Sequence, residues 1–292
     1  MPGTCLYCYN DTGTYEVGYH ITCAKKVFGQ YPPPLVPFDE KQLQLLNKAQ
    51  PCYIIERKKR GAEQARIIPQ ANGNWEIRTK QNKPIYLPEA EDLCLKMAAL
   101  AGIKTGLHTL IETVAEEQVL MVKRLDTGVS IGQLAKRKDG ENQTGSYEQL
   151  IKAVEKVSAQ PGLDKIEMVE RILFSFLAGC STINWGNIFI DKANHNLLPM
   201  ANATPTALLQ PALANQMDLL LGSKRSNITE QQIDQLFNKT GINHAARENS
   251  KRKFTRLQRD WFEIVEESYL PERLKRNYIH ILINRAERLN MM

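Results

Sequence analysis

Two hydrophobic periodicities follow one another along the chain, and they predict a small sheet followed by a helical region. Short runs of β-branched and aromatic residues alternate with polar residues in the first part, which is typical of strands. The expected strands are 52–55, 65–68, 74–78, 108–113 and 118–124. An Asn-Gly pair at 71–74 predicts a tight turn between two of them. From Leu87 the apolar period becomes helical, and Gly102 is placed to end that helix.

The rest of the chain has a helical pattern. Ser146-Tyr147-Glu148-Gln149 and Asp164-Lys165-Ile166-Glu167 both have the form of a capping box, so each is predicted to begin a helix. The second helix has a broad apolar face, which predicts a central place in the core. That face comprises Ile166, Val169, Ile172, Leu173, Phe176 and Leu177. After a loop with short strands at 180–199, the expected helices are 206–221, 229–239, 251–269 and 271–290.

The order of these elements predicts an α+β fold with a small antiparallel sheet first and a mainly helical part after it. The three predicted regions are a Cys-rich segment at 1–30, a sheet with one helix at 31–126, and a helical region at 127–292. Prolines make 31–37 a stiff connector, because proline fixes φ and blocks helix. A short helix is expected at 39–50.

Composition is that of a globular protein of 292 residues, with 42% hydrophobic and 24% charged residues. No apolar run approaches the roughly 20 residues that cross a bilayer, and Met1 is not followed by a signal-like stretch. We therefore expect a cytoplasmic protein with reduced cysteines and no membrane partner. The net charge of +6 specifies no partner.

A cluster of basic residues near the C-terminus has two interpretations. The cluster comprises Arg247, Lys251, Arg252, Lys253, Arg256 and Arg259. It could bind nucleic acid, but few aromatic residues lie among these cations, and the spacing also fits one exposed helix face. We favour the helix face. Four histidines are isolated in the sequence, and we assign them no chemistry; they are His108, His195, His244 and His280.

Three of the six cysteines lie close together near the N-terminus with a histidine. The pattern Cys5-x2-Cys8-x11-His20-x2-Cys23 has the residue types and the close pairing of a tetrahedral Cys3His zinc site. A metal ion would supply folding energy that so short a segment cannot obtain from its own core. The alternative is a set of reduced, partly buried thiols. A structural zinc site is therefore one of two open interpretations.

Several segments resemble one known family in order and spacing. They are Cys5-Leu6-Tyr7-Cys8 with Tyr19-His20 and 23–29, Leu87-Pro88-Glu89-Ala90-Glu91, Val122-Lys123-Arg124-Leu125-Asp126, 145–149, 172–177 and 260–289. Together they resemble the HipA/HipT family of kinase-fold proteins, and especially its short HipT-like members. The resemblance implies a two-lobed, protein-kinase-like fold with a sheet-containing N-lobe and a helical C-lobe. It also implies serine/threonine kinase activity on aminoacyl-tRNA synthetases, and pairing with a DNA-binding antitoxin.

Checked residue by residue, the nucleotide-binding motifs of that family are altered. The stretch at the family's phosphate loop, 56–66, keeps Gly61 but is otherwise rich in bulky cations, whereas a close backbone cradle needs small residues. Arg78 stands where the family has a nucleotide-binding Lys, and Lys80 falls on the same strand face. Glu91, the usual helix partner of that Lys, is retained. We expect it on an exposed helix face, where Glu is common for propensity alone.

The catalytic loop is altered more severely. The family pattern Gly-Asn-x-Asp-x-His-x-x-Asn here reads Gly179-Cys180-Ser181-Thr182-Ile183-Asn184-Trp185-Gly186-Asn187. Thr182 therefore replaces the catalytic Asp and Asn184 replaces the His, while Asn187, a metal ligand in the family, is kept. A threonine has no carboxylate that could orient the attacking hydroxyl.

The second metal-binding carboxylate of the family is also missing, because Asn202 stands at its position. An amide brings no charge to Mg²⁺, so we expect ATP–Mg binding to be sharply weakened. Asp191 shares a strand face with Asn187, but four residues at about 3.3 Å each place it about 13 Å away. It is a poor replacement.

These replacements lead us to interpret the chain as a HipA/HipT-like pseudokinase, a non-catalytic binding or regulatory protein. The alternatives are an active serine/threonine kinase with relocated catalytic groups and a nucleic-acid-associated repressor component. We expect a protein partner, either antitoxin-like or one that docks on the N-lobe, and contact with nucleic acid only indirectly.

Overall fold

The computed structural model describes most of the chain. The described residues are 3–13, 18–31, 52–55, 67–69, 75–78, 86–112, 118–125, 127–138, 140–212 and 217–292. Several predictions fall outside them. These are residues 32–37 of the connector, the helix at 39–50, the turn at 71–74, the phosphate-loop stretch with Gly61, and Lys80.

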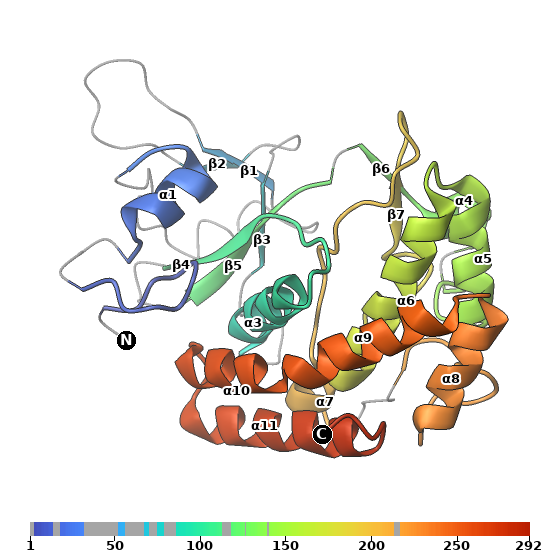
Figure 1. Cartoon of the computed structure of the whole chain (residues 1–292). Helices are drawn as coiled ribbons and strands as arrows, with labels where there is room; N and C mark the ends of the chain where they lie inside the picture. The colour runs from blue at the N-terminus through green and yellow to red at the C-terminus, as the bar shows by residue number, and fades with distance from the viewer. Residues whose placement is uncertain are drawn as a thin grey trace. The chain divides into compact units, whose positions relative to one another are not determined.

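The chain divides into two compact units, which we describe separately (Figure 1). The N-terminal unit comprises Met1–Leu93, Gly106–Asp126 and Glu267–Leu270, and the C-terminal unit comprises Cys94–Thr105, Thr127–Glu266 and Pro271–Met292. The helix α3 (Leu87–Leu100) contributes to both units. The predicted three-region division of the chain stays a prediction.

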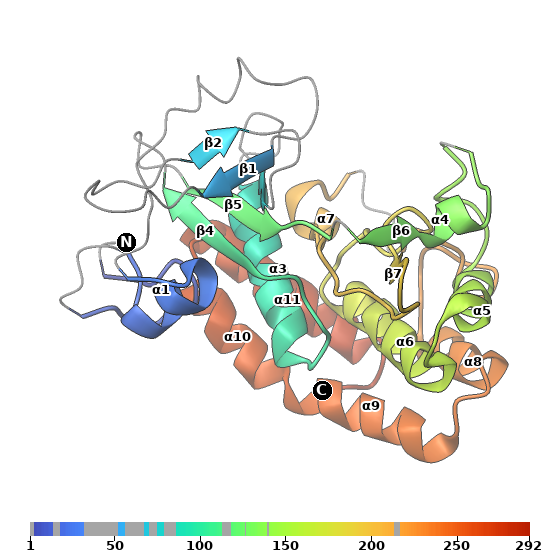
Figure 2. The ribbon, with the colours of Figure 1, turned by 90° about the horizontal axis from the view of Figure 1, so that it is seen from above.

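The N-terminal unit is built on one antiparallel sheet, seen from above in Figure 2. Its strands are β1 (Cys52–Ile55), β2 (Ile67–Pro69), β3 (Trp75–Arg78), β4 (His108–Glu112) and β5 (Gln118–Lys123). Their order in the sheet is β2-β1-β3-β5-β4, so β4 forms an edge. Each of these five strands lies within two residues of a predicted one. A further helix, α1 (Ile21–Phe28), follows His20 and was not predicted.

The C-terminal unit is mainly helical. Its helices are α4 (Ile131–Leu134), α5 (Tyr147–Val157), α6 (Pro161–Leu177), α7 (Thr206–Leu209), α8 (Glu230–Lys239), α9 (His244–Arg256), α10 (Gln258–Glu267) and α11 (Glu272–Glu287). A small sheet pairs β6 (Gly128–Ser130) with β7 (Phe189–Asp191). The central helix is α6, which contacts α5, α8, α9 and α11. This confirms the central place predicted from its apolar face.

Some helix boundaries differ from the prediction. The capping box at Ser146 is formed, but α6 begins at Pro161, so Asp164 lies inside its first turn. The Asp164 carboxylate instead accepts hydrogen bonds from the Ser158 hydroxyl at 2.5 Å and the Leu197 backbone N–H at 3.3 Å. It therefore holds a loop and is not the N-cap.

Two expected long helices are shorter or divided. The helix predicted over 206–221 ends at Leu209. Pro211 cannot continue a helix, and it also disfavours the helical conformation at the residue before it, Gln210. The helix predicted over 251–269 is two helices, α9 and α10, which meet at Leu257. The first of them begins earlier than expected, where the Asn243 side chain caps the Ala246 N–H at 2.8 Å.

The end of α6 sets the start of the loop that carries the predicted catalytic positions. The Cys180 N–H donates to the Ser175 carbonyl at 2.8 Å, and the Gly179 N–H donates to the Phe176 carbonyl at 3.1 Å. This pair of bonds is a Schellman motif, with Gly179 in the left-handed region at φ 70°. The loop at 180–187 therefore leaves the helix in a fixed direction.

The core of the C-terminal unit is aromatic around Trp261, which is fully buried. Its ring contacts Phe174 and Phe254 edge to face, and its indole N–H donates to the Met97 carbonyl at 3.1 Å.

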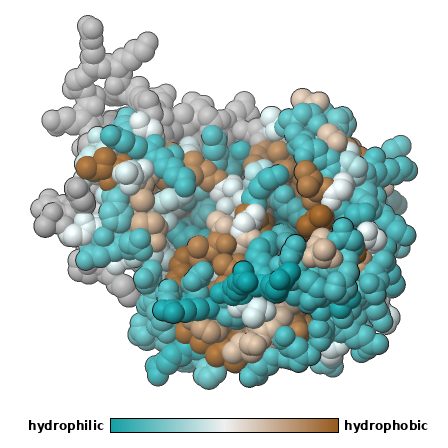
Figure 3. All heavy atoms as spheres, viewed as in Figure 1, coloured by the Kyte–Doolittle hydropathy of each residue, from teal (hydrophilic) through white to brown (hydrophobic). Residues whose placement is uncertain are grey.

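On the face drawn in Figure 3, hydrophilic residues cover most of the described surface, and hydrophobic areas are scattered among them. None of the helices in the described part of the chain is long and apolar enough to cross a bilayer.

We predict that Gly179→Ala lowers the free energy of unfolding of the C-terminal unit by about 2 kcal/mol or more. The substitution puts a side chain at positive φ, and its Cβ would lie 2.8 Å from the Ala207 Cβ. Gly162→Ala in the first turn of α6 is the matched control, because a Cβ there meets no heavy atom within 4 Å. It should be neutral or stabilising by up to about 1 kcal/mol. Urea unfolding followed by fluorescence measures both, and equal effects would contradict the motif.

Candidate functional site

The residues at the predicted catalytic positions lie close together in the C-terminal unit. The Thr182 hydroxyl donates to the Asn202 carbonyl at 3.3 Å, and the Asn187 side-chain amide donates to the Thr182 carbonyl at 3.2 Å. Thr182 is buried, whereas Asn187 and Asn202 are partly exposed. The structure therefore joins three positions that lie as much as twenty residues apart in sequence into one hydrogen-bonded group.

Asn184 uses both ends of its side-chain amide. Its Oδ1 accepts from the Gly186 N–H at 3.0 Å, which identifies the other end as the amino group. That amino group donates to the Asp218 Oδ2 at 3.0 Å. Burial raises the pKa of Asp218, while the bond from Asn184 opposes the rise. A buried carboxylate therefore stands beside the loop at a position that the sequence analysis did not single out.

No sequence signal pointed to Asp218. It falls in the stretch where we expected a continuous helix, and its approach to Asn184 depends on the chain leaving that helix early. The backbone N–H groups of Asp218 and Leu219 donate to the Tyr147 hydroxyl at 3.2 and 3.4 Å. This fully buried tyrosine fixes the carboxylate in place.

Asp191, considered above as a replacement acid, has a structural role in the turn after β7. Its Oδ1 accepts from the backbone N–H groups of Ala193 and Asn194 at 2.8 and 3.0 Å. Hydrogen bonds from Thr127 and from these two N–H groups lower the pKa of Asp191. The carboxylate is thus committed to the turn.

Trp185 anchors the loop from the other side. Its indole N–H donates to the Thr144 carbonyl at 3.0 Å, and the Arg137 guanidinium stacks 4.3 Å from the centre of its ring. Its backbone carbonyl accepts from the Gly132 N–H at 2.8 Å. The loop is consequently fixed at both of its ends and at Asn184 between them.

In the N-terminal unit, Arg78 forms an ion pair with Glu91. The guanidinium lies 3.1 Å from the Glu91 carboxylate and 2.7 Å from that of Glu76. Burial opposes the charge on Arg78, but the two carboxylates raise its pKa above the ordinary value. Glu91 is 5% exposed, so the expectation of an exposed helix face was wrong. Arg78 of β3 and Glu91 of α3 thus form an ion pair between the strand and the helix.

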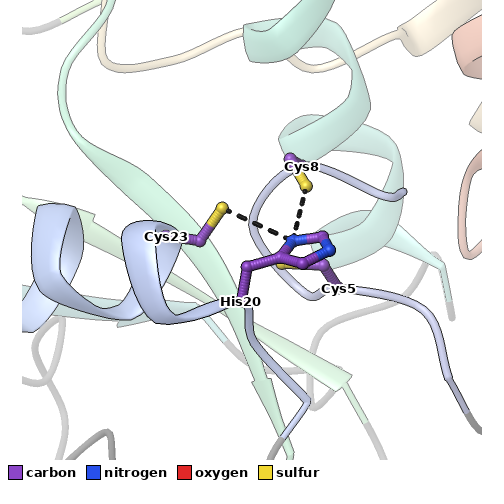
Figure 4. Close-up of side chains that lie close together, drawn as sticks. All are labelled: Cys5, Cys8, His20 and Cys23. Atoms are coloured by element: carbon purple, nitrogen blue, oxygen red, sulfur yellow. Dashed lines mark hydrogen bonds between the residues drawn. The ribbon is translucent and has the colours of Figure 1, made fainter. Parts of the chain in front are cut away.

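The four predicted metal ligands come together in the N-terminal unit (Figure 4). The ligand atoms of Cys5, Cys8, His20 and Cys23 all lie within 4.8 Å of one another. The His20 Nδ1 is 3.3 Å from the Cys8 sulfur and 3.8 Å from the Cys23 sulfur. Tetrahedral zinc, with bonds of about 2.3 Å to sulfur and about 2.0 Å to nitrogen, requires separations of roughly 3.6 Å. The cluster could therefore hold a metal ion.

The orientation of His20 also fits a ligand. Its Nε2 lies 2.9 Å from the Asp11 carbonyl, an acceptor, so Nε2 carries the proton. This bond leaves the Nδ1 lone pair directed at the sulfur atoms. A backbone carbonyl that fixes the tautomer of a ligating histidine is a common outer contact of metal sites.

The thiols of the cluster influence one another. A hydrogen bond from Cys8 lowers the pKa of Cys5 to about 4, and the same interaction raises the pKa of Cys8. Burial raises the pKa of Cys23. One thiolate is thus stabilised by its neighbours, and a cation in the centre would favour the remaining two as thiolates as well.

Comparison with protein families identifies the fold that carries these sites. The family model of the HipA-like C-terminal domain matches residues 52–262, which is most of the chain. The chain belongs to the HipA-like family. No curated protein matches its sequence.

Solved structures give the same fold. HipA of Shewanella oneidensis MR-1, determined as a toxin–antitoxin complex with HipB and operator DNA, is 14% identical, with a TM-score of 0.68 over 82% of this chain. This chain spans 62% of the length of that HipA. The proinflammatory kinase CtkA of Helicobacter pylori is also 14% identical, with a TM-score of 0.53 over 82% of this chain and 93% of CtkA. The α+β, HipA-like kinase fold is therefore confirmed.

We predict that Asp218→Asn raises the free energy of unfolding at pH 7. The pKa of Asp218 is raised on folding, so the protonated form favours the folded state and the charged form weakens it. The gain should therefore shrink as the pH falls through the raised pKa towards the ordinary value of 3.8. Urea unfolding at pH 7 and at pH 5 measures it. A loss of stability at pH 7 would show that a cation pairs with this carboxylate.

Proposed function

We propose that this HipA-like chain is a pseudokinase, a non-catalytic binding or regulatory protein that keeps the kinase scaffold. The observation that supports this most is the uncharged network of Thr182, Asn187 and Asn202. Phosphoryl transfer requires a carboxylate that orients the nucleophile and a set of ligands that neutralise the phosphates through Mg²⁺. Here a hydroxyl and an amide stand at the two positions where the family has carboxylates.

The hydroxyl cannot serve as the missing base. The Thr182 hydroxyl donates a hydrogen bond to the Asn202 carbonyl. A neutral alcohol does not accept a proton from a substrate hydroxyl near pH 7. Asn184, at the position of the family's His, is held between Gly186 and Asp218. The loop's own side chains at 182, 184 and 187 are thus neutral and lack the charges that catalysis uses.

We further infer that the protein acts through a protein partner, antitoxin-like or docking on the N-lobe, and contacts nucleic acid only indirectly. The S. oneidensis HipA was determined together with HipB and operator DNA. In this chain much of the basic cluster is engaged in ion pairs. Arg247 pairs with Asp234, Lys251 with Glu230 and Asp234, Lys253 with Glu170, and Arg259 with Glu263. Paired cations are less available to phosphates, which argues against a nucleic-acid surface. The cluster spans α9 and α10, so the expectation of one exposed helix face was wrong.

One observation favours a second candidate, an active kinase with relocated groups. Asp218 places a buried carboxylate with a raised pKa beside Asn184. Perturbed carboxyl groups are frequent at active sites. This candidate requires Asp218 to take over the role of the missing Asp.

For the cluster of Cys5, Cys8, His20 and Cys23, we propose zinc as the metal. Three sulfur atoms and one imidazole are the ligand set of closed structural zinc sites. Calcium and magnesium prefer oxygen ligands. A site that uses four protein ligands has no open position for a reacting water, so the proposed role is structural.

We predict that the purified chain incorporates no phosphate in the presence of ATP and Mg²⁺, as measured by intact-mass spectrometry, and binds ATP–Mg weakly in calorimetry. Loss of the orienting base alone removes roughly 10²- to 10⁴-fold in rate. The variant Thr182→Asp/Asn184→His/Asn202→Asp is the matched comparison. It restores the carboxylates and should bind ATP–Mg more tightly than the natural chain.

Phosphate incorporation by the natural chain would overturn the pseudokinase proposal. If the Asp218→Asn variant then incorporated no phosphate, the reaction would be assigned to the second candidate. A folded triple variant that binds ATP–Mg no better than the natural chain would contradict the role given to Asn202.

We predict about one zinc ion per chain after purification, measured by plasma mass spectrometry. Cys8→Ser should abolish zinc binding, because the three remaining ligands bind the ion far more weakly. Cys94→Ala, a buried cysteine of the C-terminal unit, is the matched control and should keep the ion. A metal-free natural chain that is fully folded would end the zinc proposal.

A further inference from the structure

The segment that carries the metal ligands covers the free edge of the sheet. β4 is an edge strand, and such strands present backbone N–H and C=O groups that another chain can pair with. The Leu110 N–H donates to the Leu6 carbonyl at 3.3 Å, and the Tyr19 hydroxyl donates to the Leu110 carbonyl. Thr109 adds a bond from its hydroxyl to the same Leu6 carbonyl at 3.2 Å. The N-terminal segment thus pairs both backbone groups of Leu110, at the middle of this edge.

The residues that make these contacts are direct neighbours of the ligands. Leu6 follows Cys5, and Tyr19 precedes His20. Tyr19 is 1% exposed, and its ring packs edge to face on Phe28 of α1. Any force that holds the ligands together therefore also holds the two residues that bond to β4.

A third neighbour of the ligands contacts α3. Tyr9 follows Cys8, and its hydroxyl donates to the Asp92 carboxylate at 2.6 Å. Both residues are buried, Tyr9 at 2% and Asp92 at 0% exposure. Asp92 is next to Glu91, which binds Arg78. The ligand segment is therefore joined to the helix that presents the Arg78–Glu91 ion pair.

Tyr9 is held in an unusual backbone conformation. Its φ of 69° lies in the left-handed region, which is uncommon for a residue other than glycine. The turn is closed by its own N–H, which donates to the Cys5 carbonyl at 2.9 Å. This turn spans Cys5 and Cys8, so a metal ion bound to both would fix it. Without such a constraint a strained turn in a short segment is expected to open.

We propose that zinc in this cluster is a clamp on the N-terminal unit, which covers the edge of β4 through Leu6 and Tyr19 and fixes α3 through Tyr9 and Asp92. The inference rests on the zinc site proposed above and assigns its function. In protein kinases the cation–Glu pair depends on the position of the corresponding helix. Metal loading of this chain thus determines how firmly Glu91 is presented to Arg78.

Hydrogen exchange of the full chain, followed by mass spectrometry, tests the clamp. Removing zinc from the natural chain with a strong chelator should raise exchange in peptides from 105–112 and 86–93 by about tenfold, the effect of losing a hydrogen bond of ordinary strength. Peptides from α8 in the C-terminal unit should not change. The chelator experiment does not depend on the folding of any variant.

Tyr9→Phe separates the clamp from the metal site. It removes the hydroxyl that binds Asp92 and leaves all four ligands in place, so it should keep about one zinc ion. Exchange should then rise by about fivefold to tenfold in 86–93 and stay unchanged in 105–112. Tyr19→Phe is the complementary variant and should raise exchange mainly in 105–112.

The two proposals fail in different ways. If zinc is present and its removal leaves exchange unchanged in both regions, the clamp is overturned and the zinc site stands. If the natural chain is metal-free and both regions are already protected, the zinc site and the clamp fail together. If Tyr9→Phe keeps its zinc and leaves 86–93 unchanged, the connection to α3 is overturned.

Discussion

Helix α6 must end at Leu177, and the C-terminal unit depends on how it ends. A residue with a Cβ at position 179 would collide with Ala207, and the left-handed conformation would strain it. Glycine permits the two backbone bonds that satisfy the Ser175 and Phe176 carbonyls at the end of a buried helix. The direction of the loop at 180–187 follows from this ending. The position of Thr182, Asn184 and Asn187 is thus a property of the backbone and is independent of catalytic chemistry.

This independence means that the loop at 180–187 needs no catalytic group to keep its shape. The contacts that hold it come from backbone groups, from the Trp185 ring and from amides. None of them needs a carboxylate at 182 or 202. In the N-terminal unit the corresponding constraint is different, because the described part of the ligand segment contains one eight-residue helix, α1, and bonds to the sheet and to α3 through a few side chains. There, the zinc proposed for Cys5, Cys8, His20 and Cys23 would add a constraint on the contacts of Leu6, Tyr9 and Tyr19, which are buried beside these residues.

Local signals in the sequence predicted local structure well. The capping box at Ser146, the alternating strands and the C-terminal glycine of α3 depend on residues within a few positions of each other. The N-cap prediction for Asp164 was wrong, although a short acidic residue followed by a Glu three residues later fits an N-cap. The hydrogen-bond partners of Asp164 are Ser158 and Leu197, which come from loops. The metal-ligand cluster was predictable because its spacing is itself a local pattern. Asp218 was not, since it reaches Asn184 through tertiary packing of Tyr147.

The proposed replacement of several kinase residues together has a physical reason. A buried carboxylate is unfavourable unless a cation or hydrogen bonds compensate it, and in a kinase loop Mg²⁺ provides that compensation. Asp218 illustrates the cost, because burial raises its pKa even though Asn184 donates to it. Without a bound metal ion, carboxylates at 182 and 202 would repel each other and weaken folding. The Thr182 hydroxyl at one of these positions instead bonds to the backbone carbonyl of Asn202. Arg78 and Glu91 neutralise each other's charge without a nucleotide, so this ion pair stays favourable in the absence of catalysis.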